Sequence, residues 1–133
     1  MPQIVIDYTA NLAPYIDPRG VLGVVHDAMM ATGGFKPSDL KGRACRLDDY
    51  LVGPSPGLPD RAFMHVRISL MTTRAVDFRA AAARRVRDAL AEAMSAALSE
   101  PGLTVEICVD VRELRREFYV KAKSARGPAE TAA

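Results

Sequence analysis

The sequence has little cysteine and no long apolar run, and each of these absences excludes a class of protein. Cys45 and Cys108 are the two cysteines among 133 residues, and neither lies in a set with metal-ligand spacing. One pair cannot form a disulfide framework, so we expect two buried thiols and no metal site. No stretch of about 18 apolar residues occurs, and no basic segment leads into an apolar run. We therefore expect a cytosolic protein without a membrane partner.

An excess of charge of one sign is also missing. The 18 Lys and Arg residues against 16 Asp and Glu residues leave a formal net charge of +2. The basic residues are scattered, and the nearest cluster, Arg112, Arg115 and Arg116, is interrupted by Glu113 and Glu117. This pattern is typical of a solvated surface, so nucleic acid is not an expected partner.

What is present is ordinary globular material, with 49% hydrophobic and 26% charged residues, enough for one core. We expect a single domain over residues 1–121. The final segment, residues 122–133, is small and polar, and it is expected to be a mobile tail.

Hydrophobic patterns predict an alternating order of strands and helices. Alternation predicts strands at residues 3–8, 43–51, 62–71 and 103–110, and a short fifth strand at 118–121. Asp17 and Pro18 begin a first helix that ends at Gly33. A second helix is predicted over residues 75–98, and residues 53–60, with three prolines and two glycines, are expected to form a loop. The second helix has an apolar stripe at steps of three and four, made of Val76, Ala80, Ala83, Val86, Leu90, Met94 and Ala97.

The order strand, helix, strand therefore occurs twice, with the second unit about 60 residues after the first. Two such βαβ units predict an α+β fold in which a four-stranded mixed sheet carries two helices on one face, because crossovers of this kind are right-handed. The opposite face of that sheet would need cover, which we expect another subunit to supply.

Pro2 leads directly from Met1 into the first predicted strand. Methionine before a small residue is usually removed, and Pro2 would then carry a free secondary amine. An α-amino group has a reference pKa of about 7.7 to 8.0, and nearby positive charge lowers it toward the neutral value that suits a general base. Proline at this position is also common and passive, so a catalytic interpretation depends on the surrounding pattern.

That pattern resembles the tautomerase superfamily, and within it the 5-carboxymethyl-2-hydroxymuconate delta-isomerase family. Four segments carry the resemblance, which spans roughly residues 2 to 121: the opening Pro2-Gln3-Ile4-Val5-Ile6, the helix exit Ala31-Thr32-Gly33-Gly34-Phe35, the strand Ala62-Phe63-Met64-His65-Val66, and Thr73-Arg74 before the long helix. The resemblance implies a homotrimer that uses Pro2 as its base and requires no metal or organic cofactor.

The resemblance also implies a small anionic substrate whose carboxylates are held by cationic side chains. Arg74 matches the family's arginine at the head of the second helix, where a guanidinium can grip a carboxylate bidentately. The family's other arginine falls on Lys41, a departure from the pattern, and Arg43 points to the same side of the strand and is a candidate to assist. Positive charge here would keep the proline amine neutral and stabilise a dienolate.

Three readings of the function stay open. The leading one is a double-bond shift in a carboxylated 2-hydroxymuconate, in aromatic catabolism. The departure at Lys41 keeps open a second reading, a related enzyme acting on a smaller keto acid or a halogenated acrylate. The third is a non-catalytic oligomeric binding protein, which retention of Met1 would favour. His65 is interpreted as a packed or interface residue, His26 as a surface or satisfied histidine, and Tyr119 as a packing residue.

Overall fold

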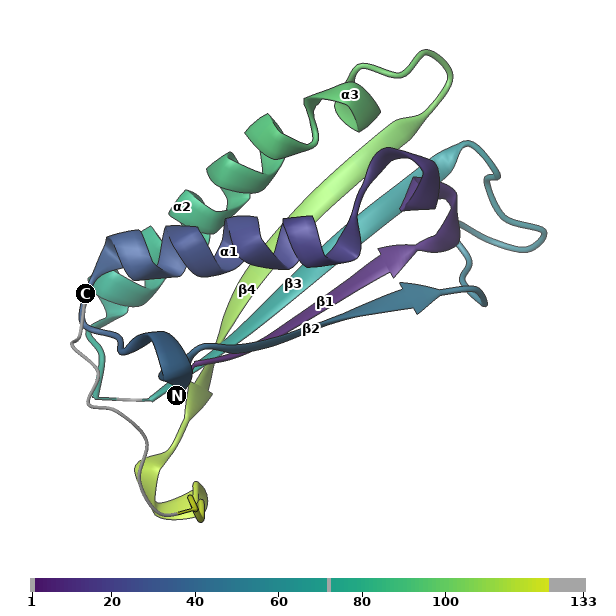
Figure 1. The fold of residues 1–133 in the computed structure, drawn as a ribbon. Helices are drawn as coiled ribbons and strands as arrows, with labels where there is room; N and C mark the ends of the chain where they lie inside the picture. The colour runs from purple at the N-terminus through teal and green to yellow at the C-terminus, as the bar shows by residue number, and fades with distance from the viewer. Residues whose placement is uncertain (1, 72, 125–133) are drawn as a thin grey trace.

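The computed structural model describes residues 2–71 and 73–124, which form one sheet with helices on one side (Figure 1). The strands are β1 (Gln3–Thr9), β2 (Lys41–Leu47), β3 (Arg61–Met71) and β4 (Thr104–Leu114). The helices are α1 (Pro18–Thr32), α2 (Val76–Ala93) and the short α3 (Ser95–Leu98). Short 3-10 helices lie at η1 (Ala10–Tyr15), η2 (Pro37–Asp39) and η3 (Arg116–Phe118).

The sheet has the order β2-β1-β3-β4 and confirms the predicted fold class. β1 pairs in parallel with β2, β3 pairs in parallel with β4, and the two units meet through the antiparallel pair of β1 and β3. Consequently β1 and β2 begin at the end of the sheet where β3 and β4 finish. Within the part of the chain that the structure describes, no helix is long and apolar enough to cross a membrane.

Strand alternation explains why one face of the sheet is buried. Along β1 and β3, every second side chain packs under α1 and α2, and the largest of them, such as Ile4, Met64 and Ile68, are fully buried. Asp17 caps α1 as predicted, because its carboxylate accepts a hydrogen bond from the Gly20 N–H at 3.2 Å. The core therefore lies between the two long helices and one sheet face.

Several strands end at other residues than predicted, because the length of a strand depends on its partner strand. β2 ends at Leu47 and not at residue 51, since its partner β1 ends at Thr9, opposite Leu47. β4 continues to Leu114, because β3 offers pairing as far as Met71. The predicted fifth strand at 118–121 is wrong: η3 ends at Phe118, and residues 119–124 have no regular structure, because the chain has run past the end of the sheet.

The predicted second helix is divided at Met94, whose backbone leaves the helical region at φ −102° and ψ 22°. Both pieces keep their apolar side to the core, since Leu90, Met94 and Ala97 are buried. The first part of the predicted stripe is wrong, because Val76 is 70% exposed. Val76, Ala80 and Ala83 line a surface cavity between α2 and β4 and do not enter the core.

The face of the sheet away from the helices, here called the open face, is polar and only partly covered. Its members include Asp7, which pairs with Arg67 at 3.5 Å, and Asp110, which pairs with His65 and with Arg112. Cys45 and Cys108 are exposed there, so the prediction of buried thiols is wrong for this chain by itself. Their strand positions place them opposite the core side, in register with Asp7 and His65. The open face is thus the surface on which another subunit was expected.

The expected tail begins at residue 122. Residues 122–124 are irregular and exposed, and residues 125–133 lie outside the described residues, as does Met1.

Candidate active site

Pro2 lies at the end of the sheet where β1 and β2 begin, directly before β1. It is buried, and its carbonyl oxygen accepts a hydrogen bond from the Lys41 backbone N–H at 3.2 Å. This bond extends the parallel ladder of β1 and β2 by one residue beyond the pair Gln3 and Lys41. The first residue of β2 is thereby fixed beside the residue from which the base was predicted.

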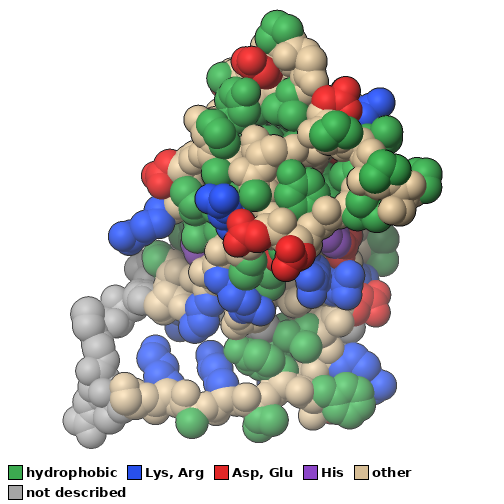
Figure 2. Space-filling view, turned by 90° about the vertical axis from the view of Figure 1, so that its right-hand side faces the viewer, with side chains coloured by type: hydrophobic (Ala, Val, Ile, Leu, Met, Phe, Trp, Pro, Cys, Tyr) green, Lys and Arg blue, Asp and Glu red, His purple; other side chains and the backbone are tan. Residues whose placement is uncertain are grey.

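Lys41 is exposed, and its ammonium donates a hydrogen bond to the Ser38 carbonyl at 2.8 Å. It lines a cavity of about 310 Å³ between the start of β2 and the C-terminal segment. Figure 2 shows a hollow between that segment and the body of the domain, with Lys and Arg side chains pointing into it. This lysine cavity, as we call it, is lined by Ser38, Asp39, Lys41, Tyr119, Lys121, Ala122 and Lys123.

The electrostatics of the lysine cavity are dominated by positive charge. Asp39 is its one carboxylate, against the ammonium groups of Lys41, Lys121 and Lys123. Burial raises the pKa of the Asp39 carboxyl, but nearby positive charges, Lys121 among them, outweigh burial and hold this pKa below its usual value. Asp39 is therefore ionised at neutral pH, and the four side chains together carry a charge of about +2.

Arg74 follows β3 at the same end of the sheet, and it packs toward the helices. Its guanidinium donates a hydrogen bond to the Gly34 carbonyl at 2.8 Å. The guanidinium carbon lies 4.5 Å from the centre of the Phe35 ring and 5.0 Å from that of Phe78. The two rings contact each other edge to face, with centres 6.0 Å apart. Arg74 is thus held in place by a carbonyl and two aromatic rings, while its side chain stays partly exposed.

Arg43, the third predicted cation, lies two residues into β2 and is exposed on the open face, in register with Val5. Lys41 belongs to the same face, because both residues have odd-numbered β1 partners. The structure therefore brings Pro2, Lys41 and Arg74 to one end of the sheet and sets Arg43 slightly further along. Among the described residues, Pro2 and Lys41 are the two candidates joined by a direct hydrogen bond.

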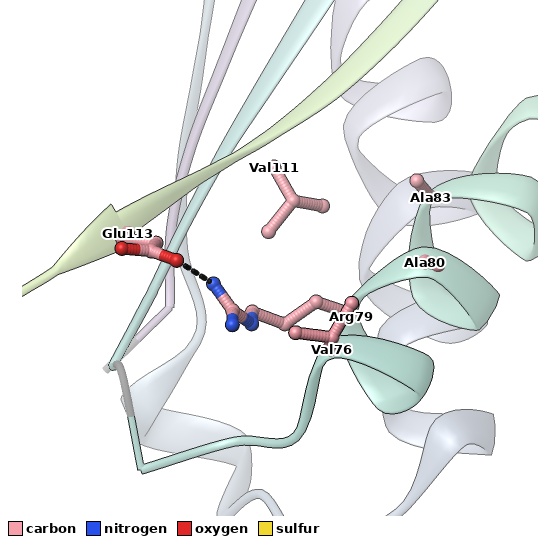
Figure 3. Close-up of a pocket in the computed structure, with 6 residues that line it drawn as sticks. All are labelled: Val76, Arg79, Ala80, Ala83, Val111 and Glu113. Atoms are coloured by element: carbon pink, nitrogen blue, oxygen red, sulfur yellow. Dashed lines mark hydrogen bonds and ion pairs between the residues drawn. The ribbon is translucent and has the colours of Figure 1, made fainter.

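A second cavity, of about 300 Å³, lies between α2 and the end of β4 (Figure 3). Arg79 crosses it from the helix and pairs with Glu113 on the strand at 2.7 Å, while Val76, Val111 and two alanines form its walls. Because the Arg79 guanidinium is engaged with Glu113, this cavity offers less positive charge to an anion than the lysine cavity does. It is a weaker candidate for carboxylate binding.

The surroundings of His65 agree with its predicted role as a packed residue, whereas those of His26 agree less well with the prediction. His65 is partly buried and hydrogen-bonds to Asp110, in keeping with a packed residue. Burial raises the pKa of the Asp110 carboxyl, and hydrogen bonds from His65 and Arg112 outweigh burial and lower it. His26 is less satisfied than expected, because its buried Nε2 has no hydrogen-bond partner in the described part of the chain. The described residues contain no group of three His, Cys, Asp or Glu side chains that could hold a metal ion.

Several residues of the site were not predicted from the sequence. Lys121 and Lys123 come from a segment with no regular pattern, and Tyr119 lines the lysine cavity instead of only packing. Phe35 and Phe78, which hold Arg74, are 43 positions apart in the sequence, and their contact depends on how α1 and α2 pack. The signal that could have found the lysines is their spacing, since two residues apart in an extended segment places them on one side.

The fold has clear relatives among solved structures. A 5-carboxymethyl-2-hydroxymuconate isomerase from Deinococcus radiodurans R1 superimposes with a TM-score of 0.76 at 18% identity, covering 92% of this chain and 90% of that one. A 5-carboxymethyl-2-hydroxymuconate delta-isomerase gives the same score and identity, covering 97% and 96%. A fused wild-type 4-OT symmetric trimer gives 0.67 at 16% identity, covering 92% and 94%. The fold is therefore that of the tautomerase superfamily.

A comparison with models of protein families identifies one family within this superfamily. The model of the 5-carboxymethyl-2-hydroxymuconate isomerase family matches residues 2–127, and the chain belongs to this family. It is accordingly an isomerase of the tautomerase superfamily. A comparison with curated proteins found no match.

Proposed function

We propose that this protein is a cytosolic, cofactor-independent isomerase that moves a double bond in a 5-carboxymethyl-2-hydroxymuconate-type substrate, with Pro2 as its base. The observation that carries the proposal is the bond between the Pro2 carbonyl and the Lys41 N–H, which sets the start of β1 against a cavity rich in cations. Family membership supports the same reaction class. In this reading, Met1 is removed and the secondary amine of Pro2 is free.

The proposed reaction is a proton transfer without net oxidation. The neutral amine of Pro2 removes a proton from the 2-hydroxy-dienoate, and the electron pair of the broken bond enters the conjugated system. The resulting dienolate carries one more negative charge than the carboxylated substrate, so the charges of Arg74, Lys41 and Arg43 stabilise it more than they stabilise the substrate. The protonated amine then returns the proton to a carbon further along the system, and the double bond has moved.

Arg74 is proposed as the main carboxylate ligand, because Phe35, Phe78 and the Gly34 carbonyl restrict its side chain. A restricted guanidinium loses less conformational entropy when it binds a carboxylate than a free one would. Lys41 supplies charge without a planar fork, and Arg43 is proposed to assist from the open face. The positive charge of these groups also favours the neutral form of the Pro2 amine.

We further propose that the protein self-associates as a homotrimer through the open face. This face is polar, half-buried and unaccompanied by helices, and it exposes Cys45 and Cys108. The solved 4-OT relative is a symmetric trimer, which supports the same arrangement here.

Intact mass spectrometry followed by kinetics of Pro2→Ala tests the proposal. We expect a mass that lacks methionine, and we expect kcat/KM to fall about 100-fold to 10,000-fold, the usual contribution of a positioned general base. Pro14→Ala is a matched control, because it changes a proline in η1 at the other end of β1. Retained methionine would contradict the base assignment and favour a binding protein. Unchanged activity of Pro2→Ala would require another base.

A second candidate function is tautomerisation of a smaller keto acid on the same scaffold. The specific observation in its favour is Lys41, which stands where the family has arginine and makes a hydrogen bond to Ser38. Turnover of 5-carboxymethyl-2-hydroxymuconate should exceed that of phenylenolpyruvate if the leading proposal is right. The reverse preference would favour the second candidate.

A further inference from the structure

The lysines of this protein are unevenly distributed. The chain has four lysines, Lys36, Lys41, Lys121 and Lys123, and three of them line the lysine cavity. Two of the three belong to the irregular segment after η3, which shares the lining of the cavity with the start of β2. The remaining cationic side chains of the protein are arginines. Three of the four lysines of the chain therefore line one cavity, although they come from two distant segments of the sequence.

The lining of the lysine cavity contains more cationic than anionic side chains. Several exposed arginines on other parts of the described surface pair with neighbouring carboxylates, as Arg46 does with Asp48, Arg87 with Asp88 and Arg115 with Glu117. The lining of the lysine cavity includes three lysines and one acidic residue, Asp39. Lys41 there bonds to an uncharged acceptor, the Ser38 carbonyl. The cavity is therefore left with positive charge that an anionic ligand can neutralise.

We infer that the lysine cavity is a second carboxylate-binding site, in which Lys121 and Lys123 of the C-terminal segment act together with Lys41. The inference rests on the proposed function, which it deepens by naming how a substrate with several carboxylates is recognised. Arg74 holds one carboxylate on the helix side of Pro2, and the lysines hold another on the side of β2. A substrate with a single carboxylate would use the first site alone.

The chemistry of lysine suits this task. Each ammonium group is a compact charge with three donors on a flexible stem, and several together can follow a carboxylate whose position changes during the reaction. Asp39 does not cancel them, because the net charge of the four side chains stays positive. The exposed position of Lys121 and Lys123 means that their replacement leaves the core unchanged.

The test uses the full-length protein and a probe that does not react, propane-1,2,3-tricarboxylate, with binding measured by calorimetry at low salt. The double variant Lys121→Met, Lys123→Met should bind this probe at least about 10-fold more weakly than the unaltered protein, a loss of about 1.4 kcal/mol. Arg87→Met is the matched control, because it also removes exposed positive charge, but from a pair on α2. It should bind as the unaltered protein does. Equal affinity of the double variant and the unaltered protein would overturn the inference.

Kinetics give a second readout. In the double variant, KM for 5-carboxymethyl-2-hydroxymuconate should rise about 10-fold with little change in kcat, since uniform binding is lost. KM for the monocarboxylate phenylenolpyruvate should stay the same. A rise in this KM as large as the rise in KM for 5-carboxymethyl-2-hydroxymuconate would count against a separate site. Binding of the probe does not require the amine, so Pro2→Ala should retain it. Failure of the catalytic proposal and failure of this one are therefore distinguishable.

Discussion

The guanidinium of Arg74 and the carbonyl of Gly34 are joined by a hydrogen bond of 2.8 Å that links the head of α2 to the exit of α1. Gly34 has a φ of +83°, and a Cβ there would lie 2.7 Å from Nη1 of Arg74. The position of the candidate carboxylate ligand thus depends on the absence of a side chain at Gly34.

Gly34→Ala should therefore move the guanidinium of Arg74 away from the Gly34 carbonyl and from the Phe35 ring. We expect KM for the substrate to rise about 5-fold to 20-fold, since the new methyl group displaces the end of the Arg74 side chain. Strain at positive φ should also lower the free energy of unfolding by about 1 to 2 kcal/mol. Steady-state kinetics and urea unfolding at one protein concentration measure the two effects.

Gly102→Ala separates strain from displacement. Gly102 has a φ of +78° and nothing within 4 Å of the added Cβ, so this variant carries the strain without the contact. Its free energy of unfolding should fall as in Gly34→Ala, while its KM should not change. A similar rise in KM for both variants would mean that displacement of the Arg74 side chain is not the cause of the effect of Gly34→Ala.

Replacement of Arg74 by lysine tests the need for a planar group. Arg74→Lys retains the charge but loses the fork, and it cannot bond to the Gly34 carbonyl and a carboxylate in the same way. We expect kcat/KM to fall about 10-fold to 100-fold, mostly through KM. Arg84→Lys, on an exposed position of α2, is the control and should be neutral. Unchanged kinetics of Arg74→Lys would contradict the proposal that the Arg74 guanidinium binds a substrate carboxylate.

The fold could largely be predicted from the sequence, because alternation and helical spacing are local signals. The strand beginning at Gln3 and the cap at Asp17 both appear where the pattern indicates. What could not be predicted is set by distant partners: β2 stops because β1 stops, and the segment after Leu114 forms no strand because it has left the sheet. The exposure of Val76 likewise depends on tertiary packing, because the first turn of α2 borders a surface cavity between α2 and β4.

The candidate site could be predicted only for residues that belong to motifs. Pro2 and Arg74 were found through a resemblance, and the structure places both at one end of the sheet. Lys121 and Lys123 belong to an irregular segment, so their proximity to Lys41 depends on the path of the chain after η3. The spacing of the two lysines indicates that they share one side of the segment, but nothing in a single sequence indicates that this side meets Lys41.

The two cysteines offer a test of self-association through the open face. Cys45 and Cys108 are exposed in the single chain, and a trimer built on this face would cover them. We expect both thiols to react with Ellman's reagent at least about 10-fold more slowly in the assembled protein than in urea. Cys45→Ser and Cys108→Ser assign each signal to its residue. Rapid reaction of both thiols in a protein that sediments as a trimer would show that another surface forms the interface.

His26 should make the stability of the protein depend on pH. Its buried Nε2 lies close to Gly42 of β2, where an added Cβ would touch it. Burial lowers the pKa of the imidazole from its usual 6.5, and the negative charge of Asp27 raises this pKa by a smaller amount. The unfolded chain therefore binds a proton more readily than the folded chain. The contribution of His26 to stability is then complete above pH 6.5 and is lost as the pH falls toward the folded-state pKa.

His26→Gln removes this titration, so its free energy of unfolding should change less between pH 7 and pH 5 than that of the unaltered protein. Urea unfolding at several pH values and a fixed protein concentration measures the difference, because assembly would otherwise contribute. Asp27→Asn is the companion variant: without the carboxylate that favours the charged imidazole, the pH dependence should become steeper. Equal slopes for all three proteins would show that the His26 imidazole is hydrated in the folded state.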